Sequence, residues 1–131
     1  MRRMVVVLVA FCLGAGVATA LAQRAKDATQ VDPEVHHVVM ENEHIRVLEV
    51  RAPVGYKSPM HSHPPVLGVS IGSGRLRVTL PDGQRQILDL RPGMVFWFDN
   101  VEHSWELLAG NHHVVAVEVK AAKRRVIDLT K

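Results

Sequence analysis

Apolar and polar residues alternate with a two-residue period in several short segments of this chain. The clearest segment spans 75–80, where Leu76 and Val78 fall on one side of an extended strand. The turn-forming residues 81–83 (Pro-Asp-Gly) follow, and the alternation resumes over 84–90. This pattern predicts a β-hairpin with one half-buried face.

Further short runs of β-branched and apolar residues lie between glycine- and proline-rich turns. They predict strands over 44–50, 66–71, 94–98, 103–108 and 114–119. The order Arg91-Pro92-Gly93 is typical of a type II turn, in which glycine supplies the positive φ. After residue 22, no segment of ten or more residues has a convincing helical period. Eight or more short strands predict an all-β domain, either a sandwich or a barrel.

The N-terminal segment has a different pattern, which is typical of a secretory signal. A basic start (1–3) precedes an uncharged apolar run (4–17), and small residues fill most of 18–22. We therefore expect a cleavable signal peptide over 1–22, with Ala18-Thr19-Ala20 as the second choice of cleavage site. The alternative is an uncleaved anchor, but the apolar run is shorter than the roughly 20 residues that cross a bilayer. The mature protein is expected to be periplasmic, without a stable membrane anchor.

Removal of 1–22 changes the composition of what remains. The only cysteine, Cys12, leaves with the leader, so neither a disulfide nor a thiolate ligand is available. The leader also carries two of the 16 Lys and Arg and none of the 13 Asp and Glu, so the mature net charge is 14 − 13 = +1. This balance gives no support to nucleic-acid binding. We expect a flexible lead-in (23–34), one β-barrel (35–120) and a basic tail or final strand (121–131).

His61-Ser62-His63 is the first group of residues with chemical potential. Residues i and i+2 of a strand point to the same face, so two imidazoles could approach one ion at about 2.0–2.2 Å. The adjacent pairs 36–37 and 112–113 would point to opposite faces and could not chelate in this way. We interpret both adjacent pairs as surface or turn residues.

The sequence around His61 and His63 resembles that of the cupin superfamily. The first cupin motif is matched by Gly55, His61, His63 and Gly74, and the second by Gly93 and His103. The resemblance spans roughly residues 40–120. It implies a double-stranded β-helix, also called a jelly roll, and a homodimer.

The chain departs from these motifs at two places. The glutamate of the first motif would fall at Leu67 or Gly68, neither of which can bind metal, and Asp99 stands where the second motif has proline. The resemblance therefore implies a three-histidine site, formed by His61, His63 and His103, for one divalent transition metal: Fe, Zn, Ni, Cu or Co. The alternative is that these histidines line a polar cavity without an ion. The candidate substitutes for the missing carboxylate are Glu49, Glu102, Glu106 and Glu118.

Two tryptophans are candidates for the wall of a ligand pocket. Trp105 shares the strand parity of His103, and Trp97 belongs to the aromatic run that leads toward it. We expect an exported metal-binding cupin that binds, and in its enzymatic version oxidises, a small organic molecule in a dioxygenase-like reaction. No catalytic residue beyond the metal ligands is assigned. The alternatives are a non-catalytic ligand-binding or sensory domain and, without positive evidence, a structural or storage protein.

Overall fold

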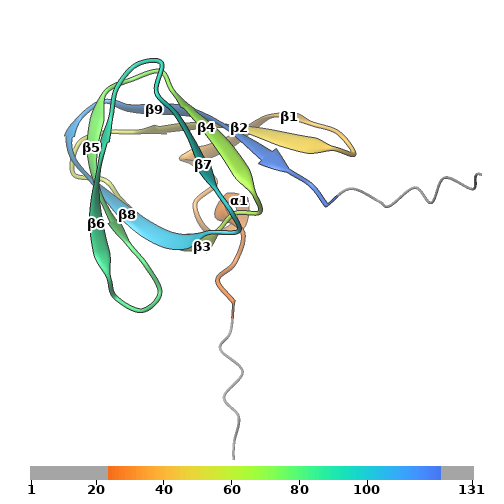
Figure 1. The fold of residues 1–131 in the computed structure, drawn as a ribbon, viewed down its shortest axis with the longest axis horizontal. Helices are drawn as coiled ribbons and strands as arrows, with labels where there is room; N and C mark the ends of the chain where they lie inside the picture. The colour runs from red at the N-terminus through yellow and green to blue at the C-terminus, as the bar shows by residue number, and fades with distance from the viewer. Residues whose placement is uncertain (1–23, 122–131) are drawn as a thin grey trace, which may run out of the picture.

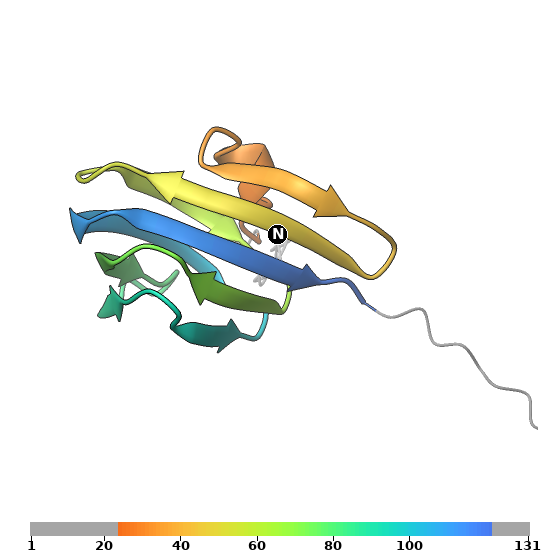
Figure 2. The same cartoon turned by 90° about the horizontal axis from the view of Figure 1, so that it is seen from above.

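The computed structural model describes residues 24–121, which form two antiparallel β-sheets and one short helix (Figure 1). The five-stranded sheet has the order β1 (His36–Glu41), β2 (Ile45–Ala52), β9 (His112–Val119), β4 (Val66–Ser70) and β7 (Val95–Phe98). The four-stranded sheet has the order β3 (Lys57–Ser62), β8 (Glu102–Gly110), β5 (Gly74–Thr79) and β6 (Arg85–Leu90). Figure 2 shows β1 at one edge of the larger sheet, beside β2. The all-β prediction is confirmed.

The hairpin and the turn predicted from the sequence are both present. Strands β5 and β6 pair in register from Gly74 opposite Leu90 to Thr79 opposite Arg85. Gly93 has a φ of +80°, and Met94 N donates to Arg91 O at 3.0 Å, as a type II turn requires.

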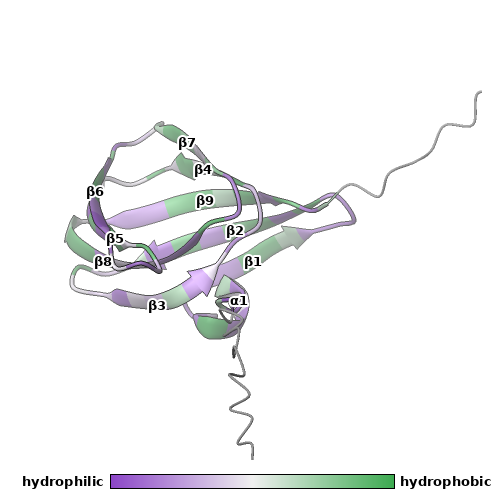
Figure 3. Cartoon of the chain, turned by 60° about the horizontal axis from the view of Figure 1, so that its bottom comes forward, coloured by the Kyte–Doolittle hydropathy of each residue, from purple (hydrophilic) through white to green (hydrophobic). Residues whose placement is uncertain are grey.

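The core lies between the two sheets and is built by strand alternation. Every second residue of β8 and β9 is buried over most of their length, which turns one face of each strand inward. Leu48 of β2 and Leu107 of β8 have no exposed surface. Each contributes about 1.5–3 kcal/mol by its burial. The inward faces are not wholly apolar: Figure 3 shows β3 hydrophilic at its arrow end.

The lead-in was expected to be flexible, but residues 24–34 pack against β3 instead. A short helix, α1 (Ala28–Val31), follows a backbone hydrogen bond from Ser62 N to Lys26 O at 2.8 Å. Asp32, at the end of α1, is 5% exposed and accepts a hydrogen bond from Tyr56 Oη at 2.6 Å. These contacts fix the direction in which the chain enters β1.

The expected signal peptide (1–22) and nearly all of the expected tail (121–131) lie outside the described residues. Within 24–121, no helix is long and apolar enough to cross a membrane.

Candidate metal centre

Strands β3 and β8 bring three histidines together in the interior. His61 and His103 are directly opposite each other in the antiparallel register of these strands. Their Nε2 atoms are 3.1 Å apart. His63 follows the end of β3, is 6% exposed, and has its ring centroid 4.9 Å from that of His61 and 5.5 Å from that of His103. The three histidines singled out in the sequence therefore share one cluster.

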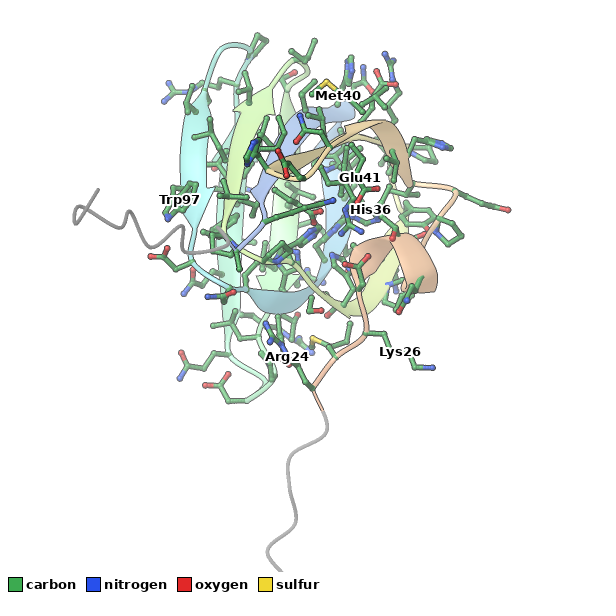
Figure 4. All side chains as sticks on the ribbon, turned by 90° about the vertical axis from the view of Figure 1, so that its right-hand side faces the viewer. Arg24, Lys26, His36, Met40, Glu41 and Trp97 are labelled. Atoms are coloured by element: carbon green, nitrogen blue, oxygen red, sulfur yellow. The ribbon has the colours of Figure 1, made fainter. Side chains whose placement is uncertain are left out.

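A fourth histidine joins this cluster from β1. His36 was interpreted as a surface residue, and that interpretation was wrong: it is 3% exposed, while the adjacent His37 is exposed. The His36 ring centroid is 4.8 Å from that of His61 and 5.6 Å from that of His63. One nitrogen from each of these three rings lies within 4.8 Å of the others. Figure 4 shows His36 in the middle of the molecule among other nitrogen-bearing side chains.

Backbone carbonyls fix the tautomer of two of these rings. Nδ1 of His61 is 2.7 Å from Pro59 O, and Nδ1 of His36 is 3.2 Å from Asp32 O. Because a carbonyl oxygen can only accept, each Nδ1 must carry its hydrogen and donate. Nε2 of each ring therefore carries the lone pair that could bind a metal ion, the arrangement usual for metal-binding histidines.

A carboxylate fixes the tautomer of His63. Nδ1 of His63 donates to Glu118 Oε1 at 2.7 Å, and Glu118 Oε2 accepts from Arg46 Nε at 2.5 Å. Arg46 in turn donates to Asp27 Oδ2 at 2.6 Å. Burial raises the pKa of Glu118, but the hydrogen bonds from His63 and Arg46 outweigh this effect and leave the pKa below its ordinary value. Glu118 is thus an anion with only 1% exposure, held at the edge of the cluster.

Burial favours the neutral form of three of these imidazoles, those of His36, His61 and His103, at physiological pH. Burial, followed by repulsion from His63 and His36, lowers the pKa of His61 to about 4. Burial and the same kind of repulsion lower the pKa of His103 to about 2 and also lower that of His36. Neutral imidazole is the form that binds metal.

The geometry of the cluster favours a transition-metal site over a group of core histidines without an ion. Two nitrogens bound to one ion at about 2.1 Å, at angles of about 90–110°, stand about 3.0–3.4 Å apart. The Nε2 atoms of His61 and His103 have this separation. The other ring nitrogen of His103, Nδ1, is buried and has no hydrogen-bond partner among the described residues, so His103 lacks the orienting contact that the other three rings have. An all-nitrogen donor set suits Zn and the late transition metals and disfavours Mg and Ca.

The structure explains why no glutamate stands in the first motif. Gly68 is the inward-facing position on β4, and a Cβ there would lie 2.1 Å from Cζ of Phe96. The Phe96 ring occupies the space that a longer side chain would need. Of the candidate substitutes, Glu118 reaches the cluster, through His63. In the register of β4 and β9 it is paired with Val66, two residues before Gly68 on the same face of β4.

The other three carboxylates lie away from the cluster. Glu49 binds Arg51 and His113, Glu102 lies 3.4 Å from the side chain of Arg24, and Glu106 binds Arg77. Glu102 and Glu106 alternate with the buried residues of β8, so strand parity turns both away from His103.

The two tryptophans have different positions. Trp105 is 6% exposed and lines the interior cavity beside the histidines. Trp97 was a candidate for the same wall, but it is 48% exposed and its Nε1 donates to Asp99 Oδ1 at 2.7 Å. The parity of β7 turns Trp97 outward between the inward rings of Phe96 and Phe98, and it lies at the edge of the molecule in Figure 4.

Comparison with known proteins identifies the fold. No protein-family model matches the sequence, and no curated protein matches it. Among solved structures, a cupin domain from Bordetella pertussis Tohama I is similar, with a TM-score of 0.60, 24% identity, and coverage of 76% of this chain and 98% of that one. An RmlC-like cupin with a double-stranded β-helix fold from Methanocaldococcus jannaschii has a TM-score of 0.54 and 19% identity, over 65% of this chain and 78% of that one.

These likenesses agree with the two-sheet antiparallel topology and with the motif residues in the sequence. The chain therefore has the cupin fold.

Proposed function

We propose that this chain is an exported metal-binding cupin that binds a small organic molecule at a histidine-held divalent transition metal. The observation that carries the proposal is a cluster of four buried imidazoles, in three of which, His36, His61 and His63, Nδ1 donates a hydrogen bond and leaves the Nε2 lone pair for an ion. His61 and His63 belong both to the ligand set predicted from the sequence, with His103, and to the group that the structure brings together with His36. His36 and His103 complete it from strands on either side.

Each residue of the site has a definite task in this proposal. Pro59 O and Asp32 O orient the rings of His61 and His36, and Glu118 orients His63 while balancing the positive charge of an ion. A bound divalent ion would supply Lewis-acid chemistry and, if it is iron or copper, redox chemistry. The apolar residues around the site exclude bulk water from the ligand.

Metal content after loading tests the proposal. The purified mature protein is exposed to Fe, Zn, Ni, Cu and Co in turn, desalted and analysed by mass spectrometry for metals. We expect about one ion per chain, lost in His61→Ala and His63→Ala and retained in the matched control His37→Ala, whose side chain is exposed. The absence of a stoichiometric ion with every metal would refute the proposal.

The enzymatic version is a dioxygenase-like oxidation of the bound molecule. Oxygen uptake by the iron-loaded protein, measured against small phenols, diketones and thiols, tests it. The alternative is a binding or sensory domain, and one observation favours it: no Asp, Glu or Lys lines the described interior cavity, which leaves His112 as its only lining residue outside the metal cluster that could transfer a proton. Ligand binding without oxygen uptake would support this alternative.

Export and pairing also belong to the proposal. The leader pattern supports export, and a mature periplasmic protein beginning at Gln23 by mass spectrometry would test it. The edge strand β1 supports pairing, because it exposes Val38, Val39 and Met40 and pairs only with β2 in the described chain. Light scattering should give twice the chain mass, reduced to the chain mass in Val39→Lys.

A further inference from the structure

The interior cavity next to the candidate metal centre is largely apolar. It has a volume of about 70 Å³ and opens between the two sheets. Leu76, Val78, Leu88 and Phe98 are among the ten aliphatic and aromatic hydrocarbon side chains that line it. At about 10–15 Å³ for each water-sized centre, the cavity holds a molecule with only a handful of heavy atoms in its enclosed part. None of its lining residues is Asp, Glu, Lys or Arg.

His112 lines the same cavity and does not belong to the metal cluster. It opens β9, is 6% exposed, and was interpreted from the sequence as a surface or turn residue, which was wrong. Its ring packs against Trp105 with the centroids 4.7 Å apart. The next residue, His113, faces outward, where its Nε2 meets Glu49 Oε1 at 3.0 Å.

The Nδ1 atom of His112 is buried and has no hydrogen-bond partner among the described residues. Buried polar side-chain atoms nearly always have a partner, because leaving one unsatisfied costs about 1–3 kcal/mol. Burial also lowers the pKa of His112 to about 4, so the ring is neutral and offers both a donor and an acceptor. An unpartnered imidazole in the wall of an otherwise apolar cavity is a suitable contact for a polar atom of a ligand.

We propose that His112 is a ligand-recognition residue, and that the ligand is a small, mainly apolar molecule with two polar atoms, one directed at the histidine cluster and one at His112. The inference rests on the proposed function for the first of these contacts. The second contact is independent of the metal ligands. A molecule with a further charged group is disfavoured, because no lining residue would compensate that charge away from the cluster.

Zinc-loaded protein allows the test without redox side reactions. The dissociation constants of phenol, catechol, resorcinol and hydroquinone are measured by calorimetry for the wild type and for His112→Phe. Phenylalanine keeps the ring volume and the packing on Trp105 but removes both nitrogens. His113→Phe is the matched control, since it changes the adjacent outward-facing histidine.

In the wild type, at least one dihydroxybenzene should bind about tenfold more tightly than phenol, the effect of one added hydrogen bond. This preference should fall to about twofold or less in His112→Phe and remain in His113→Phe, with the affinity for phenol nearly unchanged. The ring nitrogen resonances of His112 in ¹⁵N spectra should shift when the preferred dihydroxybenzene binds.

Two results would overturn the inference: an equal preference in wild type and His112→Phe, or no dihydroxybenzene binding better than phenol. Metal analysis of the same samples separates the two proposals. Protein that holds neither zinc nor, in parallel loading, any of the other four metals contradicts the proposed function. Protein that retains zinc, but whose ligand preference ignores His112, contradicts only the further inference.

Discussion

Replacing Glu118 by glutamine would test how the histidine cluster is held in place. The carboxylate accepts from His63 Nδ1 at 2.7 Å and from Arg46 Nε at 2.5 Å, with 1% exposure. A glutamine has one oxygen, which can accept from only one of these donors. Its NH₂ group must then face the other donor, so one hydrogen bond is lost and the buried negative charge disappears.

The magnitude follows from these contacts. Breaking a buried ion pair costs about 3–5 kcal/mol when the remaining charge has no other partner. Arg46 keeps its bond to Asp27 Oδ2 at 2.6 Å, so we expect a smaller loss of about 2–4 kcal/mol in the free energy of unfolding. Should the NH₂ group turn toward His63, the ring must carry its hydrogen on Nε2 and lose that lone pair. Zinc affinity should therefore fall about 10- to 100-fold.

Urea unfolding of the metal-free protein at pH 7 gives the first quantity, and competition with a chelator for zinc gives the second. Glu102→Gln is the matched control, because Glu102 lies on the outer face of β8 beside Arg24. It should change the unfolding free energy by no more than about 0.5 kcal/mol. A Glu118→Gln protein as stable as this control, with unchanged zinc affinity, would refute the reasoning.

Three further predictions concern the cluster and its supports. The pKa of His61 and that of His112 are each lowered to about 4 by burial, so the unfolded chain binds protons more readily than the folded one. The urea midpoint of the metal-free protein should therefore be constant above about pH 6.5 and fall steadily from there toward pH 4. A midpoint that rises on acidification would contradict this assignment. Gly68→Ala should lower the unfolding free energy by about 1–3 kcal/mol, because the added Cβ clashes with Phe96. Thermal denaturation should show this loss and a partial recovery of stability in the double variant that adds Phe96→Leu. A double variant without such recovery would contradict the clash. Asp32→Ala removes the acceptor of the buried Ser58 hydroxyl and of the partly buried Tyr56 hydroxyl, and should cost about 2–3 kcal/mol in urea unfolding. A near-neutral effect would contradict the docking of the lead-in on β3.

Most of the fold could be predicted from the sequence because local alternation and turn residues determine it. The β5–β6 hairpin, the turn at Gly93 and the inward parity shared by His103 and Trp105 are all readable from neighbouring residues. The convergence of His61 and His103 required the strand pairing that the cupin resemblance supplied. Strand parity alone could not give it, because the two residues are 42 positions apart.

The errors occurred where long-range packing decides which face of a strand is inside. His36 precedes a run of exposed apolar residues, so the local pattern of β1 gives no sign that this histidine is buried. Its position depends on the docking of 24–34 against β3. Neither segment has an apolar repeat, so the sequence pattern does not predict this contact. The adjacent histidine pairs contained the only usable signal: in a strand, one member of each pair must face inward. Trp97 is the opposite case: it was expected to line the interior pocket, but the parity of β7 places its side chain on the surface.

The most direct test of the central claim is an anomalous difference map from crystals of the zinc-loaded protein, collected at the zinc absorption edge. The account predicts one strong peak among the rings of His36, His61, His63 and His103, within about 2.0–2.2 Å of at least three ring nitrogens. A fully loaded crystal with its peak elsewhere, or with no peak among these rings, would contradict the claim that the cluster is a metal site.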